Sequence, residues 1–203
     1  MDLVLASGCS VWVAKNDKGK VFGGKPLGDG CLDELPNMGL SPEATKRISL
    51  IDIIWIKQNA PLYAFEVEVS TSVYSGLLRM SDLISVVPAL NVQLFIVAPK
   101  ERQEKVMDEL RRPTFQKIRL SNFSRFIPAE DLYKLAIGVE RLRGYVSQDI
   151  INTIALDLPN DPDQDSGPAR EMRANLPAKK NKRPSKIVTD PGTRRARKHS
   201  ARK

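Results

Sequence analysis

The stretch IDIIWIKQNAPLYAFEVEVS, residues 51–70, decides the fold, because it predicts two strands joined by a polar turn at residues 58–61. Side chains alternate between the two faces of a strand, so Glu66 and Glu68 share one face of the second strand. Residues paired across this hairpin have numbers that sum to about 118–120, which sets Asp52 opposite Glu66 or Glu68.

Three carboxylates on one face of a sheet form a candidate metal site. Opposed side chains in a ladder come within about 5 Å of each other. Neither strand interior has a cation to neutralise them, and Lys57 lies next to the turn. Because such oxygen ligands suit Mg²⁺ or Mn²⁺, we predict a metal site formed by Asp52, Glu66 and Glu68. The alternative is a solvated polar face, although Asp is depleted in strands and here interrupts an apolar run.

The charge of the chain divides it into a body and a tail. The 203 residues have a net charge of +8. From residue 166 onward there are 13 Lys and Arg and 2 acids, a charge of +11, which leaves −3 for residues 1–165. We expect one α/β domain over residues 1–159 and a disordered basic tail over residues 160–203, where apolar residues thin out.

The small numbers of cysteine and histidine residues argue against a disulfide-stapled protein and against a histidine-based site. Cys9 and Cys31 are too few for a disulfide framework, and His199, the one histidine, lies in the basic tail. The N-terminus does not resemble a signal peptide. No stretch approaches the ~18 apolar residues of a membrane span. We therefore expect an intracellular, cytoplasmic protein with no membrane partner and no histidine-based zinc or catalytic site.

Periodicity and turn residues predict the remaining elements. A Ser-Pro-Glu sequence at residues 41–43 is typical of a helix start. The prediction is a strand at 11–14, a turn at 16–19, a loop through 23–30, helices at 41–47 and 73–87, a strand at 91–98 buried on both faces, a helix at 100–112, a strand within 117–127, and helices at 129–144 and 147–158.

Two groups of residues are candidate contacts to nucleic acid. Ser70, Thr71 and Ser72 follow the acid-bearing strand and open the next helix, where hydroxyls and free N–H groups would face a phosphate; the alternative is ordinary helix capping. Arg79, inside that helix, would contact a phosphate or pair with Asp82.

The tail holds two basic runs that predict salt-sensitive, sequence-independent DNA binding. The alternative is a solubilising tail or a localisation signal. The cations concerned are Lys179, Lys180, Lys182, Arg183, Arg194, Arg195, Arg197 and Lys198.

The chain resembles a known family over residues 11–126. The segments VWVAKND, IDIIW, AFEVEVSTSVYSGLLRMSDL and QLFIVAPKERQEKV are similar to a group of bacterial restriction-type proteins in the PD-(D/E)XK nuclease superfamily. The resemblance implies a restriction-endonuclease-like mixed central sheet flanked by helices. It also implies Mg²⁺- or Mn²⁺-dependent hydrolysis of DNA phosphodiesters and a homodimer.

On that resemblance, Asp52 matches the metal-binding Asp of the family and Glu66 its second acid, while Glu68 stands where the family usually has Lys. The first helix of the family often supplies another acid, and little chain precedes residue 11 to form it. The alternatives are that the chain is shortened there or that Glu34 or Glu43 substitutes for that acid.

Two other interpretations stay open. The first is a non-catalytic DNA-binding or assembly subunit that keeps the nuclease fold. The second is a small α/β interaction domain whose tail is a localisation signal.

Overall fold

The computed structural model describes residues 8–69, 72–86, 92–140 and 147–158. Ser70, Thr71 and the whole basic tail lie outside these ranges, as does the predicted start of the tail at residue 160. The elements are β1 (Ser10–Val13), α2 (Lys15–Lys18), β2 (Val21–Phe22), β3 (Lys25–Pro26), α3 (Pro42–Ile48), β4 (Ile53–Lys57), β5 (Ala60–Val67), α4 (Val73–Val86), β6 (Gln93–Ala98), η1 (Lys100–Arg102), α5 (Gln103–Leu110), α6 (Pro113–Lys117), η2 (Leu120–Asn122), β7 (Ser124–Pro128), α7 (Ala129–Glu140), η3 (Gln148–Thr153) and β8 (Leu156–Asp157).

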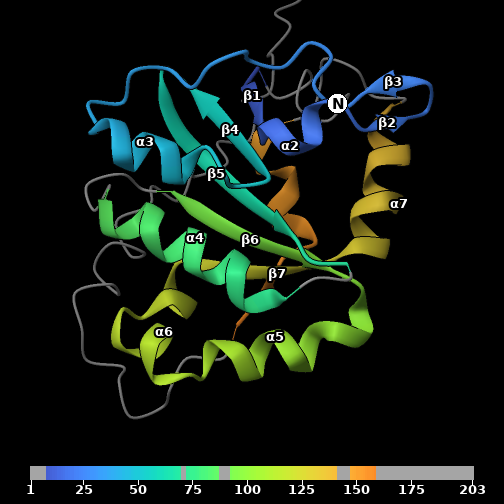
Figure 1. Ribbon diagram of the computed structural model, residues 1–203. Coiled ribbons are helices and arrows are strands. Elements are labelled where there is room, and N and C mark those ends of the chain that lie inside the picture. Colours follow the sequence, from blue (N-terminus) through green and yellow to red (C-terminus); the bar gives the residue numbers. More distant parts are fainter. Residues whose placement is uncertain (1–7, 70–71, 87–91, 141–146, 159–203) are drawn as a thin grey trace, which may run out of the picture. The chain divides into compact units, whose positions relative to one another are not determined.

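A six-stranded mixed sheet in the order β1-β4-β5-β6-β7-β8 organises the described residues (Figure 1). The pairs β5–β6 and β6–β7 are parallel, and the other neighbours are antiparallel. The mixed α/β sheet flanked by helices that the sequence predicts is therefore confirmed. No helix among the described residues is long and apolar enough to cross a membrane.

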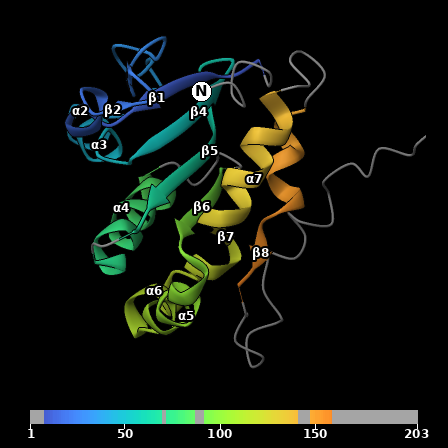
Figure 2. The ribbon, with the colours of Figure 1, turned by 90° about the vertical axis from the view of Figure 1, so that its right-hand side faces the viewer.

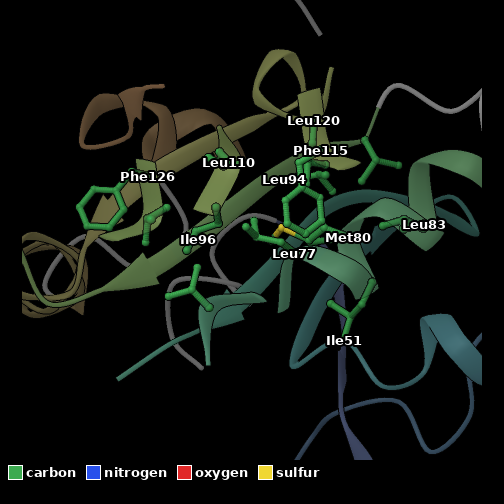
Figure 3. Close-up of a cluster of buried hydrophobic side chains, with 14 of the residues drawn as sticks. Ile51, Leu77, Met80, Leu83, Leu94, Ile96, Leu110, Phe115, Leu120 and Phe126 are labelled. Carbon is green, nitrogen blue, oxygen red and sulfur yellow. The ribbon is translucent and has the colours of Figure 1, made fainter. Parts of the chain in front are cut away.

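Helices cover both faces of this sheet (Figure 2). Leu94 and Ile96 of β6 point into the larger core, with side chains of α3, α4, α5 and α6 (Figure 3). Phe95 and Val97 point into a second cluster that includes Val139 of α7. The strand predicted to be buried on both faces is thus confirmed, because successive side chains alternate between two covered faces.

The last described segment closes the second cluster. Tyr63 of β5 donates a hydrogen bond to Oδ1 of Asp149 at 2.9 Å, across 86 positions of sequence. Arg125 of β7 donates to Oδ1 of Asn152 at 3.0 Å and to the carbonyl of Ala155 at 2.5 Å. Residues 147–158 therefore belong to the packed domain.

The central hairpin turns more tightly than predicted. Gln58 and Asn59 form the turn, with φ of 52° and 63°, whereas Ala60 and Pro61 already belong to β5. Positive φ at both central residues matches the twist of paired strands, and Asn tolerates that conformation. The predicted four-residue turn at 58–61 is therefore wrong in length, because Ala60 and Pro61 belong to β5. A β-bulge interrupts the pairing of the two strands between Trp55 and Ile56. Beyond the bulge, pairing brings the chain at Asp52 beside the end of β5.

Other boundaries also differ. Residues 15–18 form a helical turn, and the predicted loop contains the β2–β3 hairpin, whose strands pair Val21 with Pro26. The predicted last helix is a 3-10 helix followed by β8, an edge strand on β7. Ser41 caps α3 as predicted, because its Oγ accepts the Ala44 N–H at 3.2 Å.

Candidate active site

Asp52 precedes β4 and reaches across to the end of β5. Its Oδ2 accepts a hydrogen bond from the backbone N–H of Val67 at 2.8 Å. Its own carbonyl accepts the N–H of Ala14 at 3.0 Å, which ties the residue to the chain that follows β1. The strand register therefore places the Asp52 carboxylate next to Glu66, as the alternation of the sequence predicts.

Glu66 and Glu68 are buried against helix α4, with relative exposures of 0% and 2%. Gly76 of α4 permits this close approach. A Cβ atom at Gly76 would lie 2.5 Å from Oε1 of Glu68 and 3.3 Å from Cβ of Glu66. The two acids thus share one face of the strand, and that face is covered by the helix backbone rather than by solvent. The alternative of a solvated polar face is wrong for both acids.

Arg79 of α4 supplies the cation that the strands lack. Its Nε donates to Oε1 of Glu66 at 2.8 Å, and its Nη2 donates to Oε2 of the same carboxylate. Nη2 also lies 3.8 Å from Oδ1 of Asp52. This fork-to-fork geometry makes the pair with Glu66 directional as well as electrostatic.

The alternative pairing of Arg79 with Asp82 is wrong, because Asp82 lies 3.7 Å from Nη1 of Arg47 instead. Arg79 follows Gly76 by three positions, and side chains at that spacing share a helix face. The face that lets the helix approach the acids therefore carries the arginine to them. The spacing alone does not predict the contact, because the two positions meet the acids only once α4 packs on the sheet.

Burial sets the protonation of the two acids. It raises the pKa of Glu66 to about 8, against the lowering effect of the Arg79 hydrogen bond. Burial also raises the pKa of Asp52, while the Val67 N–H and Arg79 act in the opposite direction. The hydrogen bond to Glu66 in turn raises the pKa of Arg79. The site is therefore a partly desolvated carboxylate pair balanced by a guanidinium.

The structure does not gather the acids around a common metal position. In the ranges that it describes, no group of three or more His, Cys, Asp or Glu side chains is arranged to hold a metal ion. Arg79 occupies the place between Asp52 and Glu66. The three-carboxylate metal site thus stays a prediction.

Ser72, predicted as a phosphate contact, is exposed at the start of α4. Its backbone carbonyl accepts a hydrogen bond from Oγ of Ser75 at 2.9 Å. Ser70, Thr71 and the tail cations lie outside the described residues, so the structure leaves those predicted DNA contacts as predictions.

A second cationic group near the acids was missed by the sequence reasoning. Lys20, just before β2, pairs with Asp17 at 2.5 Å. Both charges are close enough to act on Asp52: Asp17 raises the pKa of its carboxyl, and Lys20 lowers it. The base of the β2–β3 hairpin therefore adjoins the candidate site.

Residues 2–158 match the family described as the Type II restriction enzyme NmeDI C-terminal domain, and the chain belongs to that family. The Type II restriction enzyme NmeDI of Neisseria meningitidis serogroup C is 32% identical over 152 residues. The match covers 71% of this chain and 43% of that relative, so the chain spans less than half of its length. No solved structure matches the chain.

Proposed function

We propose that this chain is a restriction-type nuclease domain of the PD-(D/E)XK kind, with an ExE variant of the motif, that hydrolyses phosphodiester bonds of DNA. The observation that carries the proposal is the meeting of Asp52, just before β4, and Glu66, near the end of β5, at one guanidinium. Membership of a family named after a restriction enzyme supports the choice of DNA as substrate.

The donor chemistry of the site fits Mg²⁺ or Mn²⁺. Asp52, Glu66 and Glu68 offer hard carboxylate oxygens, and all three act electrostatically on the single charge of Arg79. In the structure Arg79 donates hydrogen bonds to both carboxylate oxygens of Glu66, so the Arg79 side chain has to move away before Glu66 binds a metal. A bound Mg²⁺ would supply charge neutralisation at the phosphate and an activated water.

The side chains around that position have distinct proposed roles. Asp52 and Glu66 hold the cation, and Glu68 either joins them or accepts a proton from the attacking water. Arg79, once released from Glu66, offers its guanidinium to a phosphate oxygen of the substrate. Ser70, Thr71 and Ser72 contact the DNA backbone beside them, and the basic tail binds DNA without sequence preference.

The proposal is tested by cleavage of plasmid DNA in Mg²⁺ or Mn²⁺. We expect nicking or linearisation by the wild-type chain, loss of it in Asp52→Asn, and retention of it in the matched control Asp82→Asn, whose carboxylate pairs with Arg47. Equal cleavage by the wild-type chain and Asp52→Asn would show that the site is misplaced.

A second function, a DNA-binding or assembly subunit without catalysis, is favoured by one observation. The family's lysine position is occupied by Glu68, and the cation that the structure shows at the acids is Arg79, which binds Glu66 instead of leaving it open. This alternative predicts salt-sensitive DNA binding with no metal-dependent cleavage in the plasmid experiment. An interaction domain without DNA function predicts that Asp52→Asn leaves Mn²⁺ affinity unchanged.

A further inference from the structure

The β2–β3 hairpin presents an exposed apolar tip. Val21 and Phe22 of β2 are 67% and 76% exposed. Phe22 pairs with Lys25 across the hairpin, and Gly23 and Gly24 form the turn with φ of 59° and 79°. The hairpin lies at the edge of the described residues in Figure 1. An aromatic side chain so placed contributes nothing to the described core.

The base of the hairpin is fixed to the domain. Nζ of Lys18 donates to the carbonyl of Leu32 at 2.6 Å and lies 4.5 Å from the ring centroid of Trp12. The N–H of Gly28 donates to the Lys18 carbonyl at 3.0 Å. A Cβ atom at Gly28 would lie 2.9 Å from Cβ of Lys18, so the two chain segments pack closely. The tip is therefore held in a defined direction.

Charge and position favour DNA as the binding partner of this tip. Lys20 and Lys25 are exposed and flank the apolar pair in sequence. Lys20 pairs with Asp17, whose N–H donates to the carbonyl of Ala14 at 2.8 Å. The N–H of Ala14 donates in turn to the carbonyl of Asp52 at 3.0 Å, so the base of the hairpin lies beside the candidate active site. A two-stranded ribbon fits the major groove, about 12 Å wide, and apolar side chains such as Phe wedge between base steps in the minor groove.

We propose that the β2–β3 hairpin enters a groove of the DNA duplex beside the candidate active site, with Phe22 against the bases and Lys20 and Lys25 at the flanking phosphates. The inference rests on the proposed function and adds a structural element that engages the substrate. It makes the hairpin the part of this domain that responds to base stacking, whereas the tail responds to charge alone.

The test measures affinity of the full chain for a labelled duplex by fluorescence anisotropy without divalent metal. We expect Phe22→Ser to weaken binding at least about fivefold, because the variant has no ring to place against a base. The matched control is Tyr133→Ser on α7, which removes an aromatic side chain of similar exposure, 63%, and should leave affinity unchanged. Lys25→Gln should reduce the slope of log affinity against log salt by about 1.

A second readout keeps the test informative if Phe22→Ser folds poorly. A 2-aminopurine probe in the duplex brightens when its base is unstacked, so its signal should rise with the wild-type chain and stay flat with Phe22→Ala, which has no side chain long enough to enter between bases. Absence of both duplex binding and plasmid cleavage by the wild-type chain would overturn the proposed function itself. Equal binding by the wild-type chain and Phe22→Ser would overturn only the hairpin inference, and loss of a dimer in that variant at unchanged DNA affinity would assign the tip to a second copy.

Discussion

Arg79 joins the carboxylates of Asp52, which directly precedes β4, and Glu66 of β5, 14 positions apart in sequence. Glu66 is almost fully buried and has both oxygens engaged by this one side chain. This buried pair differs from a surface ion pair, because water does not replace the guanidinium when the guanidinium is removed. The residue therefore has two consequences that can be measured, one for stability and one for metal binding.

We predict that Arg79→Met lowers the free energy of unfolding by about 1–3 kcal/mol, because it leaves the buried Glu66 carboxyl group without its hydrogen-bond partner. Mn²⁺ should then stabilise the variant more than it stabilises the wild type, since the metal no longer competes with Arg79. Urea denaturation with and without Mn²⁺ measures both effects. The control is Arg111→Met, which removes an exposed pair with Asp108 and should cost less than about 1 kcal/mol. Equal losses in the two variants would contradict the prediction.

The pH dependence of stability should report on the same acids. Burial raises the pKa of Glu66 from 4.5 to about 8 and also raises that of Asp52. The folded state therefore holds these protons more tightly than the unfolded state does. Their stabilising contribution is fully present below the unfolded pKa and is lost as pH rises through the folded pKa.

We thus expect the free energy of unfolding to fall between about pH 5 and pH 9, with a smaller fall in Glu66→Gln, which cannot ionise. Urea denaturation of both proteins across this range makes the comparison. An identical fall in the variant would show that other groups cause the dependence.

At the scale of elements, the fit of α4 against β5 depends on a residue without a side chain. Gly76→Ala places a Cβ 2.5 Å from Oε1 of Glu68, which has to shift within a buried site. We expect a loss of about 1–3 kcal/mol, the usual cost of overpacking. The control is Gly138→Ala in α7, where a Cβ meets nothing within 4 Å; it should gain up to about 1 kcal/mol from helix propensity. Thermal unfolding of the two variants should move in opposite directions, and a shared direction would contradict this account.

The sequence predicts elements well where a strong period runs through them. The apolar run of β6 is confirmed as a strand buried on both faces, because one pattern specifies both the element and its buried faces. The β2–β3 hairpin was missed because its strands are only two residues long and its glycines indicate a loop. The shortness of the strands and the glycines together set the limit there.

At the candidate site, too, the sequence predicts some contacts and not others. Asp52 and Glu66 could be brought together from the sequence, since strand register is a local property of one hairpin. The role of Arg79 could not, because it depends on how α4 docks on the sheet. That docking is set by Gly76, whose missing side chain leaves no pattern of its own.

At the scale of the whole molecule, charge is divided unequally along the chain: residues 166–203 carry +11, whereas the full chain carries +8. We predict that replacing Lys179, Lys180, Lys182 and Arg183 by Gln lowers the slope of log DNA affinity against log salt by about 3–4, because each phosphate that a cation neutralises adds about 0.9 to that slope. Titrations between about 50 and 200 mM salt measure the slope. An unchanged slope would indicate that these cations keep the chain soluble or act as a localisation signal instead.

The hydrogen bond between Tyr63 and Asp149 has a consequence for the chain as it leaves the ribosome. The central strand emerges first, and 86 further positions must be made before its hydroxyl meets this partner. At 5–20 residues per second, this wait lasts roughly 4 to 17 s. During that time the aromatic cluster of Trp55, Tyr63, Phe65 and Phe95 lacks the cover of Ile151 and Ala155. Nascent chains of this domain should therefore be clients of co-translational chaperones until residue 158 is exposed.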